Sequence, residues 1–255
     1  MSWNPAQYLK FAQPRLRPAL ELLARIDLES PAVVYDLGCG TGAATKIMAG
    51  RWPRASVFGV DESSDMLEGA VGAPSNVRWL RQDIGTWQPD CAPDLVYSNA
   101  ALHWLPDHGR LLTGVAAALA PRGVLAVQMP RNFAAPSHVA IAETVREGPW
   151  RSRLEPLLRE SPVADPTWYF DLLSPLFDRI DLWQTEYFHV LRGDDPVKEW
   201  IKGSWLRPLL LALPPGERER FEHAYARRLA AAYPKRADGT TVLPFLRLFF
   251  VARRD

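Results

Sequence analysis

The sequence predicts an α/β fold in which helices cover both faces of a mostly parallel sheet. The first observation is the stretch 33–42, VVYDLGCGTG, in which an apolar run ends at Asp36 and glycines follow at 38, 40 and 42. This pattern is typical of a buried parallel strand that turns tightly into a helix. The second is that strand-like and helix-like segments alternate up to residue 133. The third is that polar residues follow the apolar runs, where open α/β sheets bind their ligands.

The composition fits a single domain over residues 1–255. Hydrophobic residues make up 47% of the chain, which is enough for a full core. The net charge of +1 gives no indication of a nucleic-acid partner. The two cysteines make neither a disulfide framework nor a metal cluster, so we expect no metal. Because the chain shows no leader and no long apolar span, we expect a cytoplasmic protein that does not bind membranes. We expect it to be a monomer or a weak homodimer.

The first 25 residues are expected to form a lid and a helix. A helix over 14–25 would carry Leu16, Leu20 and Leu23 on one stripe that faces the core. The preceding segment contains Trp3 and Tyr8, and we expect it to close over a ligand, because terminal segments often exclude water from active sites.

Five strands are expected in the first half of the chain, and the glycine turn lies at the end of the first. After the helix over 42–51, apolar runs at 56–61, 77–82, 94–98 and 124–129 predict the other four, with a helix over 108–120 before the last. The spacing Gly38-x-Gly40-x-x-Ala43 also fits a dinucleotide fingerprint, so an NAD(P)-dependent oxidoreductase is an alternative. Asp36, however, would face a diphosphate with like charge. It suits a cofactor with a cationic end, such as S-adenosylmethionine.

Polar residues after the fourth and fifth strands are expected to face the same crevice. Asn99, His103 and Trp104 follow the fourth strand, which should adjoin the first, and Gln128, Arg131 and Asn132 lie at the end of the fifth. Beyond residue 133 the regular alternation stops. We expect partly helical structure over 134–166, a helix over 168–177, a strand over 180–190, a helical insert over 191–240 that covers the substrate, and a closing strand over 243–252.

The turn DLGCGTG resembles motif I of the class I S-adenosylmethionine-dependent methyltransferases. Further segments make the chain similar to the trans-aconitate methyltransferases of that superfamily: WNPAQYLKFAQPR, NAALHWLPDH, VLAVQMP, WLRP and RLFFVARR. The stretch 148–166 lies outside this resemblance. The resemblance implies a Rossmann-like, seven-stranded, mostly parallel sheet whose last strand is antiparallel and pairs between the fifth and sixth. It also implies transfer of a methyl group from S-adenosylmethionine to a carboxylate of trans-aconitate, a small tricarboxylate. Another small carboxylic acid is the alternative acceptor.

The residues expected to act follow from these strand ends and from the resemblance. A carboxylate is ionised at neutral pH and needs no general base, so we expect no catalytic residue, and only positioning by His103 and Trp104. The expected cofactor-binding residues are Asp36, Gly38, Cys39, Gly40, Asp61, Glu62, Met66, Asp83, Ile84, Asn99 and Ala100. The expected substrate-binding residues, chosen as aromatic side chains and as donors to carboxylates, are Tyr8, Trp104, Arg131, Asn132, Trp205, Arg207 and Arg247.

Overall fold

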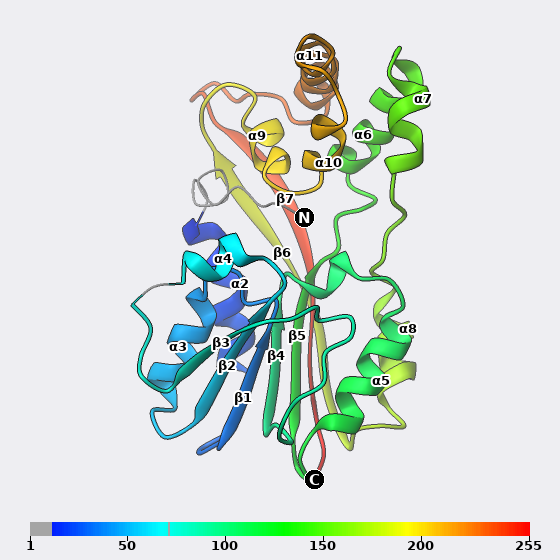
Figure 1. Cartoon of the computed structure of the whole chain (residues 1–255). Helices are drawn as coiled ribbons and strands as arrows, with labels where there is room; N and C mark the ends of the chain where they lie inside the picture. The colour runs from blue at the N-terminus through cyan, green and yellow to red at the C-terminus, as the bar shows by residue number, and fades with distance from the viewer. Residues whose placement is uncertain (1–11, 71) are drawn as a thin grey trace.

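The computed structural model describes residues 12–70 and 72–255, and its centre is a seven-stranded sheet (Figure 1). The strand order is β3-β2-β1-β4-β5-β7-β6, and β7 alone runs antiparallel to its two neighbours. The strands are β1 (Val33–Leu37), β2 (Ser56–Asp61), β3 (Val77–Arg81), β4 (Leu95–Asn99), β5 (Val124–Pro130), β6 (Arg179–Leu191) and β7 (Thr241–Arg253). The predicted fold is therefore confirmed, including the place of the last strand.

The order of the strands reverses at β1. Val34 pairs with Val57 of β2 on one side and with Leu95 of β4 on the other. Ligands of open α/β sheets bind at such switch points, beyond the carboxyl ends of the strands. The glycine turn after β1 and the loop after β4 meet at this place.

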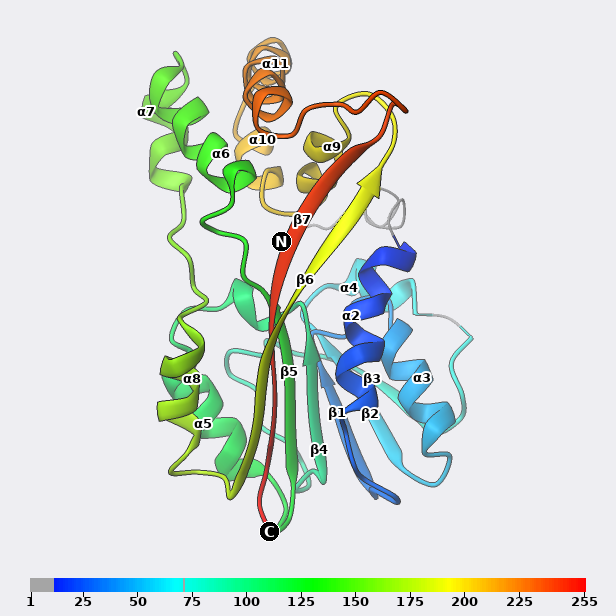
Figure 2. The same ribbon diagram turned by 180° about the vertical axis from the view of Figure 1, so that it is seen from behind.

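Helices cover both faces of the sheet. One face packs against α2 (Ala12–Ala24) and α3 (Ala43–Arg51), with Leu22 and Met48 in its core (Figure 2). The other packs against α5 (His108–Ala118) and α8 (Pro166–Leu173), with Leu112 in its core (Figure 1). Neighbouring residues of β1 divide between the two cores, Val34 facing the first and Tyr35 the second, because side chains alternate along a strand.

The predicted apolar stripe of the first helix is wrong in part. Leu20 is exposed, whereas Ala19, Leu22 and Leu23 are buried. The helix has apolar residues on adjacent faces, and contact with the sheet selects one of them. Glu21 fixes that orientation because its carboxylate accepts hydrogen bonds from three side chains of β6.

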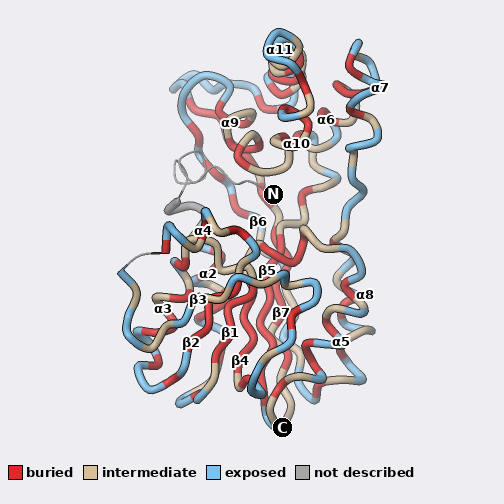
Figure 3. The backbone as a smooth tube through the Cα atoms, in the orientation of Figure 1, coloured by how far each residue is buried: buried red, intermediate tan, exposed pale blue. Residues whose placement is uncertain are grey.

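A helical cap lies beyond the carboxyl ends of the parallel strands, where β6 and β7 extend past the rest of the sheet (Figures 1 and 2). The predicted insert 191–240 supplies three of its helices, but the segment after β5 contributes as well. Tyr225 of the insert donates a hydrogen bond to the Ser137 carbonyl, 2.9 Å away, and joins the two segments. The cap has its own core, separate from those of the sheet (Figure 3). Its elements are α6 (Pro136–Glu147), α7 (Arg151–Leu154), η2 (Glu155–Leu157), α9 (Pro196–Lys202), α10 (Arg207–Leu211) and α11 (Pro215–Ala232).

Within residues 12–70 and 72–255, no helix is both long and apolar enough to cross a membrane. The same residues contain no group of three or more His, Cys, Asp or Glu side chains that could hold a metal ion.

Candidate active site

The glycine turn between β1 and α3 has a backbone shape that needs glycine. Gly38 has a φ of 76°, and a Cβ added to it would lie 2.1 Å from the Cβ of Ala101. Its N–H donates to the Val60 carbonyl of β2 at 2.8 Å. The turn is thus pressed between β2 and the loop after β4. Gly40 also has a positive φ, of 55°, but it faces open space.

A cavity of about 430 Å³ opens in front of this turn, within the size range of small-molecule sites. All eleven residues predicted to bind the cofactor line it. Eight further lining residues were not predicted, because most are apolar residues in helices and loops and the prediction relied on polar residues at strand ends. They are Leu16, Ala19, Thr41, Ala43, Ala44, Ala101, Leu105 and Arg159. The roles of all these residues stay predictions, but the strand ends do bring them together.

Four carboxylates give this cavity a negative character. They belong to Asp36, Asp61, Glu62 and Asp83. Asp36 is 2% exposed, and its Oδ2 accepts a hydrogen bond from the Thr45 hydroxyl at 2.6 Å. Burial raises the pKa of Asp36 to about 7, and the charge of Asp61 also raises it. A cation beside Asp36 would remove this penalty, so the end of the cavity at β1 favours a positively charged group.

The carboxylate of Asp61 is held at the end of β2. Its Oδ2 accepts from the Gly40 N–H and its Oδ1 from the Ser63 N–H, both at 2.9 Å. In the next strand end, Asp83 Oδ1 accepts from the Gly85 N–H at 2.8 Å. Backbone donors therefore orient both carboxylates.

Aromatic side chains join the cavity at the glycine turn to the cap. Trp104, from the short helix η1 (Leu102–Trp104), stacks on Trp205 of the cap with ring centroids 5.2 Å apart. Phe133 meets Trp205 edge-on at 4.9 Å. The sequence predicted Trp104 and Trp205 as site residues, and the fold brings them into contact.

Buried polar side chains lie at the ends of β4 and β5. Each of the following atoms is buried without a hydrogen-bond partner in the described part of the chain: Asn99 Oδ1, His103 Nδ1, Gln128 Nε2 and Asn132 Nδ2. Leaving a buried polar group unsatisfied costs about 1–3 kcal/mol, so this region is suited to a polar ligand. Burial, with the nearby charge of Arg247, lowers the pKa of His103 to about 3. His103 is therefore neutral at physiological pH.

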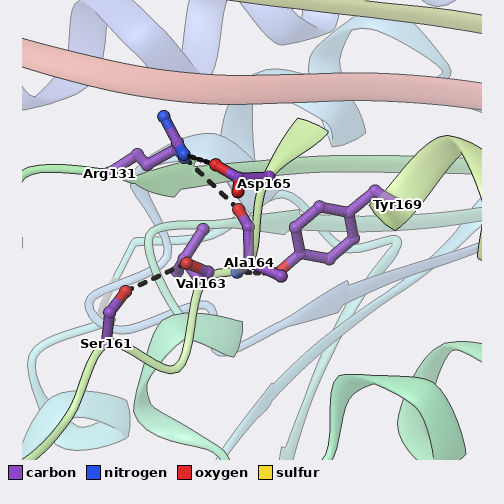
Figure 4. Close-up of polar contacts among 6 residues, drawn as sticks. All are labelled: Arg131, Ser161, Val163, Ala164, Asp165 and Tyr169. Atoms are coloured by element: carbon purple, nitrogen blue, oxygen red, sulfur yellow. Dashed lines mark hydrogen bonds and ion pairs between the residues drawn. The ribbon is translucent and has the colours of Figure 1, made fainter. Parts of the chain in front are cut away.

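A second cavity, of about 1570 Å³, lies against the cap and the extended ends of β6 and β7. Arg131, Asn132 and Trp205, three of the expected substrate residues, line it, and their role toward a substrate stays a prediction. The guanidinium of Arg131 is already engaged, because it forms an ion pair with Asp165 and its Nε donates to the Ala164 carbonyl at 3.3 Å (Figure 4).

Three of the expected substrate residues are not placed in either cavity. Tyr8 lies outside the described residues. Arg207 and Arg247 line neither cavity. Arg247 is 5% exposed, lies over the ring of Phe245 at 4.6 Å and donates to Gln128 Oε1 at 3.4 Å. Buried in this way, Arg247 holds Gln128 and packs on Phe245. Its role toward the substrate stays a prediction.

Comparisons with known proteins agree with this geometry. A family model described as a methyltransferase domain matches residues 8–171. The chain is 45% identical over 253 residues to the trans-aconitate 2-methyltransferase of Azoarcus sp. (strain BH72) and 44% identical over 253 residues to that of Agrobacterium fabrum (strain C58 / ATCC 33970). Each alignment covers 99% of both chains.

Solved structures share the fold at low sequence identity. A putative methyltransferase from Bacillus halodurans C-125 aligns with a TM-score of 0.61 at 13% identity, over 93% of this chain and 99% of that one. The phosphoethanolamine N-methyltransferase 2 of Haemonchus contortus, solved with S-adenosylhomocysteine, aligns with a TM-score of 0.56 at 15% identity, over 94% of this chain and 53% of that one. The chain thus belongs to the methyltransferase-domain family and, within it, to the family of the trans-aconitate 2-methyltransferases.

Proposed function

We propose that this protein is a carboxyl O-methyltransferase that transfers a methyl group from S-adenosylmethionine to a carboxylate of trans-aconitate. The products are the monomethyl ester and S-adenosylhomocysteine. The observation that carries the proposal is the likeness, over nearly the full length, to relatives named trans-aconitate 2-methyltransferase. The glycine turn and its cavity support the assignment of the cofactor. The likeness over the rest of the chain supports the assignment of the acceptor.

The four carboxylates and the volume of about 430 Å³ support S-adenosylmethionine as the ligand of the cavity at β1. Asp36 would hold the ammonium of the methionine end, and Asp61 at the end of β2 would accept from the ribose hydroxyls. Asp83 and Ile84 would flank the adenine. Gly40 leaves open space beside its backbone, so a ligand can approach the turn closely. When bound, S-adenosylmethionine supplies an electrophilic methyl group.

The chain's own residues would act by orientation and by excluding water. The acceptor carboxylate is already ionised, so no side chain has to remove a proton. Since His103 is neutral and buried, lines neither cavity and packs against Trp104 with ring centroids 4.7 Å apart, we assign it a positioning role that acts through Trp104. The stacked Trp104 and Trp205 would shield the reacting oxygen from water, and this exclusion of water strengthens electrostatic contacts. The same rings would restrict the acceptor to an approach in line with the methyl group and the sulfur.

The test is methyl transfer from radiolabelled S-adenosylmethionine by the full chain, with trans-aconitate beside other small di- and tricarboxylates. We expect label in the monomethyl ester of trans-aconitate, identified by mass spectrometry, and thermal stabilisation by S-adenosylhomocysteine but not by NAD(P). Label in a different acid alone would replace the acceptor. Stabilisation by NAD(P) alone would replace the reaction class.

The cellular setting belongs to the same proposal. We infer that the enzyme works in the cytoplasm on a free small molecule, as a monomer or a weak homodimer. Light scattering of the purified chain, with and without S-adenosylhomocysteine, measures the oligomeric state.

A further inference from the structure

We infer that Arg159 binds a carboxylate of the substrate that does not react, at the junction of the two cavities. This inference rests on the proposed function and adds a specificity-determining residue to it. Arg159 lies in the stretch that the sequence resemblance left uncovered, and it was not among the predicted substrate residues.

The position of Arg159 is unique among the described residues. It lines the cofactor cavity of about 430 Å³ and also the cap cavity of about 1570 Å³, and no other described residue lines both. An acceptor must enter from outside and place one oxygen beside the methyl group in the cofactor cavity. A side chain at the junction is therefore beside the acceptor when it reacts.

The charge of Arg159 is also distinctive at this place. Among the described residues that line the cofactor cavity, four are carboxylates and Arg159 is the one Lys or Arg. A tricarboxylate that approaches this negative cavity needs a cation near its free carboxylates. Arginine suits this task because its planar guanidinium donates two parallel hydrogen bonds to one carboxylate.

Arg159 is available, whereas other cations of the cap cavity are engaged. No hydrogen bond or ion pair joins Arg159 to another residue within 12–70 and 72–255. Its side chain is exposed, so a ligand can reach it. By contrast, the other cations that line this cavity lie beside acidic partners: Arg131 pairs with Asp165, Arg146 with Glu155, and Lys235 with Asp194, and Arg236 lowers the pKa of Asp238.

The backbone that carries Arg159 is anchored on both sides. Before it, the Leu158 N–H donates to the Glu155 carbonyl at 3.1 Å, and the Leu158 side chain packs on the cap core. After it, the Arg131 Nε donates to the Ala164 carbonyl at 3.3 Å, so the far end of the same loop is tied to the residue that follows β5 (Figure 4). The guanidinium can therefore turn toward a ligand without refolding of the loop.

The experiment that tests this inference compares Arg159→Ala and Arg159→Lys with the wild type and with the control variant Arg153→Ala. Arg153 lines neither cavity and pairs with Glu217 at 2.7 Å on the cap, so its variant controls for the loss of one surface charge. Each protein is assayed for kcat and KM with trans-aconitate, and for the Kd of S-adenosylhomocysteine. Calorimetry also measures binding of trans-aconitate to the protein saturated with S-adenosylhomocysteine, which needs no turnover.

We expect Arg159→Ala to raise the KM and the Kd for trans-aconitate roughly 10- to 100-fold, with the Kd of S-adenosylhomocysteine unchanged. Arg159→Lys should recover part of this loss, because it keeps the charge but not the paired donors. The preference for trans-aconitate over trans-glutaconate, which lacks the central carboxylate, measures specificity and should shrink in Arg159→Ala if Arg159 holds that group. An unchanged preference with a raised KM places the contact on a terminal carboxylate and still supports the inference.

Two outcomes would overturn the inference while leaving the proposed function intact. One is wild-type KM and Kd for trans-aconitate in Arg159→Ala. The other is a weaker Kd for S-adenosylhomocysteine with unchanged KM, which would show that Arg159 binds the carboxylate of the cofactor instead. If the wild type fails to methylate trans-aconitate, the proposed function fails first, and the calorimetric arm then decides whether Arg159 binds the tricarboxylate.

Discussion

Replacing Asp36 by Asn should stabilise the free protein and weaken its binding of the cofactor. The variant keeps the size of the side chain and an oxygen that accepts from Thr45, and it removes the buried charge. A pKa of about 7, against an ordinary value of 3.8, means that burial disfavours the charged form by about 4 kcal/mol. Because the group is almost fully buried, little of this penalty is screened by solvent.

The sign of the pH dependence follows from the raised pKa. The folded protein holds a proton on Asp36 that the unfolded chain has released, so the stability from this group is present below about pH 4 and is lost as the pH rises to about 7. At pH 8 we expect free Asp36→Asn to be up to about 4 kcal/mol more stable than wild type. For a chain of this length that is a rise of up to roughly 10 °C in Tm, measured by scanning fluorimetry.

Cofactor affinity should change in the opposite direction. If Asp36 pairs with the ammonium as proposed, loss of this buried charge costs about 2–5 kcal/mol, so the Kd of S-adenosylhomocysteine should rise at least about 30-fold. In the wild type this Kd should also rise as the pH falls from 7.5 to 5.5, because Asp36 takes up a proton while the α-amino group of the ligand stays charged. Calorimetry across this range measures both effects.

Asp65→Asn is the control for this experiment, since Asp65 is exposed in the helix α4 (Ser64–Glu68) and does not line the cavity. It should bind and unfold like the wild type. The reasoning is refuted if the wild-type Kd is the same at pH 5.5 and 7.5, or if Asp36→Asn binds S-adenosylhomocysteine as tightly as the wild type does.

Four other substitutions test separate parts of the site. Gly38→Ala places a methyl group 2.1 Å from the Cβ of Ala101 and should lower Tm by several degrees, whereas Gly40→Ala meets nothing within 4 Å and should cost about 1 kcal/mol for its positive φ alone; equal Tm values would contradict this. Trp205→Ala removes a ring that lines the cap cavity and stacks on Trp104, and should raise the KM for the acid several-fold without changing the Kd of S-adenosylhomocysteine; a kcat and KM equal to wild type would remove Trp205 from the site. His103→Gln should reduce kcat about tenfold but leave the shape of the kcat–pH curve between pH 6 and 8 unchanged, because the pKa of His103 is about 3; loss of an ionisation in that range would assign it a proton-transfer role.

The sheet could be predicted from the sequence because its signals are local. Apolar runs of five or six residues with polar residues at their ends mark β1 to β5, and the predicted 56–61 matches β2. Other boundaries moved by a residue or more: β4 begins at Leu95 rather than at 94, where the side chain of Asp94 instead accepts from the backbone N–H groups of Ala32 and Val33. Such a contact joins residues about 60 positions apart, and no local pattern contains it.

The gathering of the expected cofactor residues around one cavity was predictable for the same reason. Its residues follow parallel strands, and parallel strands must end at one edge of the sheet, so eleven residues chosen from the sequence line one cavity. The substrate side was not predictable in this way. It depends on how two distant segments of the cap pack together, and an arginine pattern cannot tell that Arg131 is engaged with Asp165 whereas Arg159 reaches both cavities.

The sequence by itself therefore determined the fold, the glycine turn and the carboxylates in front of it, since strand periodicity, backbone requirements and strand ends are properties of neighbouring residues. Three features were decided by the tertiary structure alone. They are the buried face of the first helix, the place of residues 136–157 in the cap, and the identity of the arginine that lines both cavities. These outcomes depend on packing and on ion pairs between residues far apart in the chain, and the free energies of such contacts are fixed only when the whole chain has folded.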